Sequence, residues 1–61
     1  MAKYKIFQIY KNLNDYRAKI KMEKPKYLGM YSGKSPLHAI YESAKDAGIY
    51  IDCMTAELAK E

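Results

Sequence analysis

Apolar and polar residues alternate along the first half of the chain, and this pattern predicts extended strands. The segment 3–11 is rich in tyrosine, isoleucine and phenylalanine, which favour strands. Over 16–23 the alternation is strict, with apolar residues at the even positions and charged residues at the odd ones. A third such segment, 27–32, follows a break at Pro25, because proline cannot donate to a strand ladder. We therefore expect three antiparallel strands joined by short turns.

The hydrophobic period changes from two to about 3.6 residues after Ser35. Apolar side chains then stand three and four positions apart, at Leu37, Ile40, Tyr41 and Ala44. Ser35 is a typical N-cap, Pro36 suits the first turn of a helix, and Gly48 suits the position just after the last turn. The sequence therefore predicts a helix over about 36–47, whose apolar stripe covers one face of the sheet.

The C-terminal segment is less distinctive. Residues 49–53 are apolar enough for a fourth short strand, which a right-handed crossover would lay parallel to the first strand, in the order 3-2-1-4. Asp52 or Thr55 is then a candidate cap for a last helical turn through Leu58. Without that strand, one side of the first strand stays exposed, and a homodimer is expected.

These elements predict an α+β fold. Its core is a three-stranded antiparallel sheet, with a fourth short strand at 49–53 as an alternative, and one helix at about 36–47 packs on one face. A chain of 61 residues is long enough for one small domain, 1–61, with one thin core. Residues 59–61 are expected to fray, as the last residues of a domain often do.

Charge divides the chain into two unlike halves. Residues 1–34 contain nine basic and two acidic residues, a net charge of +7, whereas residues 35–61 contain two basic and five acidic residues, a net charge of −3. The formal total of +4 conceals this difference. Because such asymmetry bears on binding partners, we expect a polyanion to bind the first half of the chain.

Several function classes are disfavoured by composition. No apolar stretch approaches the ~20 residues that span a bilayer, and the N-terminus lacks the apolar core of a signal peptide. Cys53 alone cannot form an intramolecular disulfide or a cysteine zinc site, and we expect it to be a small buried residue. His38 falls on the polar side of the predicted helix, far from any nucleophile. We therefore expect a cytoplasmic protein that is not an enzyme and has no cofactor, metal or membrane partner.

The strongest candidate chemistry is a basic sheet face. On the predicted strands, Arg17, Lys19 and Lys21 share one face, and free N–H groups at 33–35 precede a helix that can hold a phosphate. The predicted nucleic-acid-binding residues are Lys5, Lys11, Arg17, Lys19, Lys21, Lys26, Lys34 and Ser35. We expect non-specific contacts to phosphates, with double-stranded DNA favoured over RNA. The simpler interpretation is that these lysines provide solubility and protect a sheet edge.

A protein-interaction module is the alternative from another class. Phe7 and Ile9 stand among lysines, as aromatic and apolar anchors do inside a charged rim. Exposure of both side chains would favour a protein partner with an acidic surface, such as the target of a small virus- or plasmid-encoded inhibitor or an antitoxin-like protein. A covering layer would favour nucleic acid. Single-stranded RNA is favoured if several tyrosines present flat faces beside lysines, the candidates being Tyr4, Tyr10, Tyr27 and Tyr31.

The region 29–44 resembles the motif of the methanogen chromosomal protein family. The matching positions are Gly29, Tyr31, Ser32, Gly33, Lys34, Pro36, Ala39 and Ala44. The resemblance implies binding and bending of double-stranded DNA without strong sequence preference. The predicted layout of three strands followed by a helix is also similar to ethylene-response and integrase arm-binding domains, which implies that the sheet reads the major groove.

Overall fold

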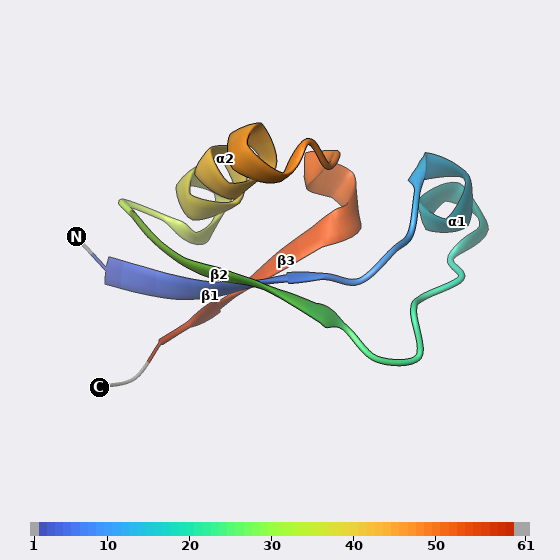
Figure 1. Cartoon of the computed structure of the whole chain (residues 1–61), viewed down its shortest axis with the longest axis horizontal. Coiled ribbons are helices and arrows are strands. Elements are labelled where there is room, and N and C mark those ends of the chain that lie inside the picture. The colour runs from blue at the N-terminus through green and yellow to red at the C-terminus, as the bar shows by residue number, and fades with distance from the viewer. Residues whose placement is uncertain (1, 60–61) are drawn as a thin grey trace.

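A three-stranded antiparallel sheet organises the fold of the computed structural model, which describes residues 2–59 (Figure 1). Strand β1 (Ala2–Gln8) is central, β2 (Lys26–Gly33) pairs with one side of it, and β3 (Met54–Leu58) pairs with the other. The predicted α+β class and the three-stranded antiparallel sheet with one main helix are confirmed.

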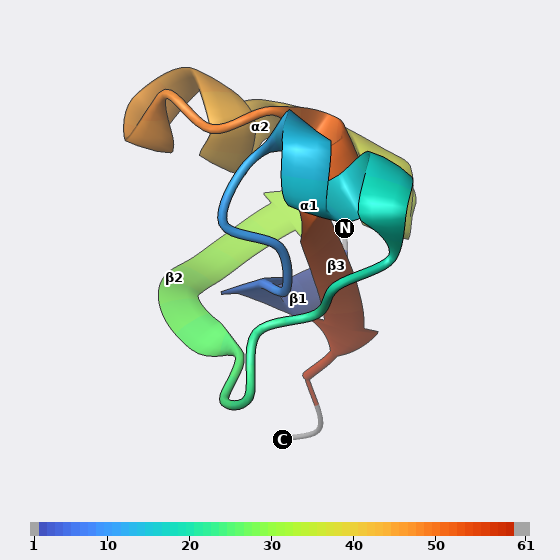
Figure 2. The same ribbon diagram turned by 90° about the vertical axis from the view of Figure 1, so that its right-hand side faces the viewer.

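Helix α2 (Pro36–Ala47) confirms the helix predicted over 36–47, including both caps. The Ser35 hydroxyl accepts a hydrogen bond from the His38 N–H at 3.2 Å. At the other end Gly48 adopts a left-handed φ of 68°, and its N–H donates to the Ala44 carbonyl. The helix lies across one face of the sheet, which is clear in both Figure 1 and Figure 2.

The buried side of α2 is rotated from the predicted stripe. Ala39 and Ser43 are fully buried, whereas Leu37 is 53% exposed and Tyr41 is 48% exposed, so the prediction that these two pack on the sheet is wrong. The physical reason is a close approach of helix and sheet. A Cβ atom built on Gly33 of β2 would lie 2.9 Å from the Ala39 nitrogen, and only small residues fit such a contact.

The core lies between α2 and the sheet. Alternate residues of β1 point into it, and of these Ile6 is completely buried and Tyr4 nearly so. The buried cluster consists of Tyr4, Ile6, Ala39 and Met54, and the partly buried residues around it are Leu28, Tyr31, Ile40, Ala44, Ile49 and Ala56. Because this core is small, each buried side chain carries a large share of the stability.

The strand predicted over 16–23 is wrong, because helix α1 (Leu13–Ala18) occupies its first half. The Asn12 side chain accepts a hydrogen bond from the Asp15 N–H at 2.8 Å and caps the helix. Lys19 ends it in the left-handed conformation, with φ 59° and ψ 36°. The strict alternation therefore does not reflect half-burial, and most of these side chains are exposed. Local capping decides the structure here, since the segment pairs with no strand among residues 2–59.

The left-handed conformation of Lys19 makes a testable prediction about stability. Among residues 2–59 it is the one non-glycine residue with positive φ, a conformation that costs an L-residue about 1–2 kcal/mol. We expect Lys19→Gly to raise the free energy of unfolding by about 0.5–1 kcal/mol, after the added flexibility of the unfolded chain is subtracted. Urea denaturation measures this change. Lys21→Gly is the control, and equal or greater stabilisation by Lys21→Gly would contradict the explanation.

The C-terminal strand differs from prediction in position and direction. Residues 49–53 form no strand, since they end in the 3₁₀ turn η1 (Ile51–Cys53), and the predicted helical turn through Leu58 is replaced by β3. β3 runs antiparallel to β1, not parallel. Helix α2 runs in the direction of β1, and the turn η1 that follows it lies beside α1, so the chain enters β3 from that end (Figure 1). Strands β2 and β3 therefore flank β1 in the split β-α-β arrangement.

The end of the described chain is held by the sheet. The Ala59 N–H donates to the Lys3 carbonyl at 3.0 Å, and the fraying expected over 59–61 stays a prediction. Residues 60–61 of that prediction lie outside the described residues.

Candidate nucleic-acid interface

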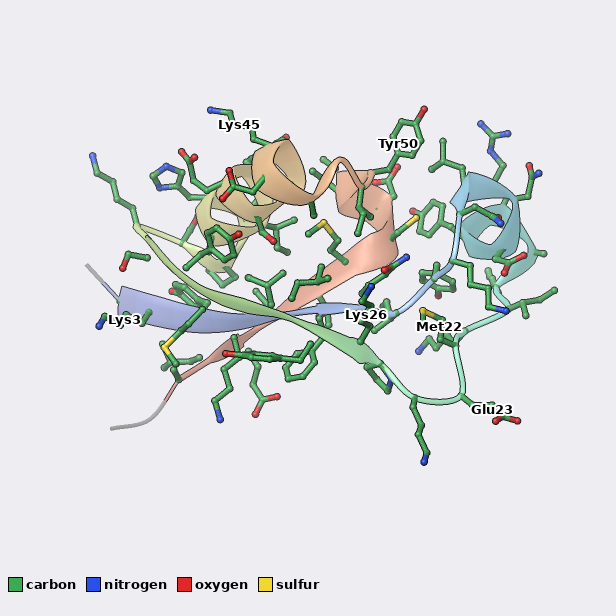
Figure 3. The ribbon with its side chains drawn as sticks, viewed as in Figure 1. Lys3, Met22, Glu23, Lys26, Lys45 and Tyr50 are labelled. Carbon is green, nitrogen blue, oxygen red and sulfur yellow. The ribbon has the colours of Figure 1, made fainter. Side chains whose placement is uncertain are left out.

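The face of the sheet opposite α2 carries a mixed aromatic and charged surface, which we call the open face. Residues directly opposite each other on antiparallel strands share a face, and Tyr4 and Ile6 of β1 point toward α2. The open face therefore consists of Lys3, Lys5, Phe7, Tyr27, Met30, Ser32, Thr55 and Glu57. No helix lies over it in Figure 1 or Figure 2, and side chains project from it in Figure 3.

An aromatic pair lies at one end of the open face. The rings of Phe7 and Tyr27 are 5.4 Å apart between centroids and tilted by 53°. Phe7 is half-buried, whereas Tyr27 is 52% exposed and the neighbouring Met30 is 49% exposed. The open face thus presents the exposed apolar side chains of Tyr27 and Met30 on β2 beside Phe7 of β1.

A basic end adjoins this aromatic pair. It consists of the exposed cations of α1 and its flanking segments, namely Lys11, Arg17, Lys19, Lys21, Lys24 and Lys26. Residues 11–26 include two acids, Asp15 and Glu23, so their net charge is +4. In Figure 3, Met22 and Glu23 lie at this end of the molecule and Lys3 at the other, with Lys26 between them at the start of β2. The molecule measures 34 × 20 × 15 Å, and α1 with the segments before and after it lies at one end of the longest axis (Figure 1).

The cations of the basic end have no acidic partner among residues 2–59. The ion pairs within this range both lie on α2, where the Glu42 carboxylate is 3.7 Å from the His38 ring and 3.9 Å from the Lys45 ammonium. Lysines without ion-pair partners remain available to phosphate groups. The acidic residues of α2 lie on the far side of the sheet from the open face.

The predicted basic platform at the centre of the sheet is not present. Arg17 belongs to α1 and Lys19 to its C-terminal cap, while Lys21 follows in the connection to β2. Lys11 lies between β1 and α1, so of the predicted strand-face lysines only Lys5 is on the open face. The reason is the replacement of the predicted second strand by α1. The structure therefore gathers four of these residues at the basic end instead.

Lys34 and Ser35 lie at the opposite end of the sheet, in the connection from β2 to α2. The Lys34 N–H donates to Nδ1 of His38 at 3.2 Å, and the Ser35 hydroxyl is occupied as the N-cap. Pro36 contributes no N–H. The Lys34 and His38 N–H groups are thus already used within the chain, which lowers the capacity for the phosphate expected there.

The two residues singled out for a protein interface have different positions. Phe7 lies on the open face without a covering layer, as the interaction alternative requires. Ile9 is half-buried just beyond β1, where its N–H donates to the Cys53 carbonyl and its carbonyl accepts from the Met22 N–H. Ile9 therefore ties the basic end to the sheet.

The tyrosines expected to offer flat faces beside lysines are mostly engaged elsewhere. Tyr4 and Tyr10 are buried, and the Tyr10 ring meets Tyr16 edge-on at 5.4 Å. The Tyr31 hydroxyl donates to the Asp46 carboxylate at 3.0 Å, and this hydrogen bond raises the pKa of Tyr31. Only Tyr27 of the four candidates meets the condition.

The prediction that Cys53 is buried is confirmed. Burial is the main cause that raises the pKa of its thiol, and the nearby Asp52 carboxylate adds to the effect. A thiol held in its neutral form is a poor nucleophile.

Sequence reasoning missed Met30 as a site residue, and it named Tyr27 only as one of four candidate tyrosines. Simple alternation groups Tyr27 with Tyr31, but a bulge changes this. Ile6 pairs with Gly29 and the next residue, Phe7, pairs with Tyr27, so Leu28 is an extra residue on β2. Gly29 accommodates the irregularity with a φ of 125°. The signal for this bulge in the sequence was Gly29 itself, because a glycine inside an apolar strand often marks an irregularity.

No group of three or more metal-ligating side chains is found within residues 2–59, and no helix in that range has the length and apolar character to cross a membrane. Comparisons with protein-family models, with curated proteins and with solved structures find no match to this chain.

Proposed function

We propose that this chain binds nucleic acid through the basic end together with the adjoining open face. The observation that carries the proposal is the concentration of six exposed cations at one end of the molecule, without acidic partners among residues 2–59. Lysine and arginine contacts to phosphates supply most of the affinity of non-specific nucleic-acid binding. The resemblance of 29–44 to a DNA-binding family points the same way and stays a prediction.

The expected preference for duplex DNA loses its structural argument. It required basic residues along the centre of the sheet, and the open face carries Lys3 and Lys5 on β1 but the acidic Glu57 on β3. The element order also differs from three strands followed by a helix, the layout on which the likeness to sheet-reading domains was based. We therefore propose that the phosphate contacts are made mainly by the basic end, and not by the centre of the sheet.

Chemical-shift mapping tests the location of the interface. Titration of the isotope-labelled protein with a short DNA oligonucleotide is expected to shift the amide resonances of three regions. These are residues 11–26, β1 and the start of β2. The amides around Leu37 and Tyr41, on the outer side of α2, serve as the internal control and are expected to stay in place. Shifts centred on α2, or none at all at low salt, would contradict the proposal.

A protein partner with an acidic surface is the second candidate, and Phe7 on the uncovered open face favours it. Such a partner would use the same cations and the same aromatic pair. Chemical-shift changes at the basic end on addition of nucleic acid alone favour the first candidate. Absence of such changes leaves the protein partner.

A further inference from the structure

We infer that the open face is a stacking surface for unpaired bases, so that the nucleic acid bound is single-stranded. This inference rests on the proposed function and specifies its ligand. It starts from the Phe7–Tyr27 pair, whose rings are 5.4 Å apart on a face that no element within residues 2–59 covers. Aromatic rings exposed on a sheet are the common platform on which proteins stack bases, because every base has a π-face.

Charge complementarity identifies the occupant. Along β1, Lys5 lies two positions before Phe7 on the same face, about 7 Å away along the strand. On the other side, the connection that leads into β2 at the basic end carries the exposed Lys21 and Lys24, whereas Lys26 pairs with Gln8 and belongs to the opposite face of the sheet. Cations therefore lie before Phe7 on β1 and before Tyr27 in the connection to β2. A single strand of nucleic acid, in which phosphates alternate with flat bases, matches this arrangement of cations and aromatic rings.

The same face is poorly matched to a duplex. Base pairs in a duplex keep their flat faces stacked on one another, so a duplex offers no π-face to Tyr27, which is 52% exposed, or to Met30, which is 49% exposed. Glu57 on β3 also repels phosphates on that side of the sheet. The favoured path of a single strand runs over β1 and β2, from the basic end toward Lys3.

The experiment compares two labelled probes of about ten units, a single-stranded oligothymidylate and an abasic strand with the same number of phosphates. We expect the wild-type chain to bind the thymidylate probe about tenfold more tightly. Tyr27→Leu is expected to remove that difference while it leaves affinity for the abasic probe unchanged. Tyr27→Phe keeps the ring and is expected to behave as wild type. Tyr50→Leu, which removes an exposed tyrosine away from the open face, is the matched control.

Other outcomes overturn the inference and are distinguishable from failure of the proposed function. Equal wild-type affinity for the two probes, or equal losses for both in Tyr27→Leu, would mean that phosphates alone are bound. Self-association that Tyr27→Leu abolishes would mean that a second copy of the chain covers the open face. Absence of binding to either probe at low salt would instead refute the proposed function itself. Circular dichroism of each variant verifies that it is folded.

Discussion

Reversing two charges at the basic end, with Lys21→Glu and Lys24→Glu together, is expected to lower affinity for single-stranded DNA about sixtyfold at 50 mM salt. Both side chains are exposed in the connection from α1 to β2, so the substitutions leave the core intact. Each phosphate contact to a single strand contributes about 0.7 to the slope of log affinity against log salt, which amounts to about a factor of eight at that salt concentration. Two lost contacts therefore give about sixtyfold, before any added repulsion.

The control for this pair changes the net charge equally at another place. Lys34→Glu with Lys45→Glu also lowers the net charge by four, but Lys34 lies at the far end of the sheet and Lys45 on α2. We expect about a threefold loss or less, because exposed charges separated by more than about 14 Å are largely screened at 50 mM salt. Fluorescence anisotropy with a labelled oligonucleotide measures both variants. Equal losses for the two pairs would show that only total charge matters and would contradict a localised interface.

Ile6→Ala is expected to unfold a large fraction of the protein. Ile6 is completely buried at the centre of the central strand, between β2 and β3 and under α2. Removal of an isoleucine side chain to alanine in a packed core costs about 2–5 kcal/mol. A chain of this length has about 3–9 kcal/mol of total stability. Urea denaturation followed by circular dichroism measures the loss.

Two further variants calibrate this prediction. Ile6→Val removes one methylene and is expected to cost about 0.5–1.5 kcal/mol. Leu58→Ala removes an exposed side chain at the end of β3 and is expected to change the stability by about 0.5 kcal/mol or less. An Ile6→Ala protein as stable as Leu58→Ala would mean that the core does not lie between α2 and the sheet.

Helix α2 was predictable because its signals are local. Ser35 caps the first turn through its own hydroxyl and Gly48 ends the last turn with its own backbone, so neither depends on distant contacts. The side of the helix that is buried depends instead on how closely it approaches β2. That distance is a tertiary property, and the exposure of Leu37 and Tyr41 follows from it.

One wrongly predicted element, the strand over 16–23, made the rest of the predicted topology wrong. The alternation over 16–23 fits a strand. The structure instead has the short helix α1, with Asn12 as its N-cap and Lys19 as its C-cap. With no strand there, β2 runs opposite to β1, and α2 returns the chain to the end of the sheet near α1. β3 must then run antiparallel to β1, where a meander of three strands would have made it parallel.

The candidate site was predictable in its charge but not in its place. The excess of basic residues in 1–34 is visible in composition, and the structure assigns most of it to the basic end. The aromatic pair could not be predicted, because it depends on the extra residue Leu28, which moves Tyr27 to the face of Phe7. A one-residue irregularity reverses the face of every side chain beyond it.

The most direct test of nucleic-acid binding is a titration of the wild-type chain with a labelled single-stranded oligonucleotide at several salt concentrations, with a duplex of the same sequence as the comparison. If the basic end makes three to five phosphate contacts, log affinity falls against log salt with a slope of about −2 to −3.5. The single strand binds more tightly than the duplex. Absence of binding at about 20 mM salt, or a slope near zero, would contradict the central proposal and leave the lysines of the basic end as solvated surface groups.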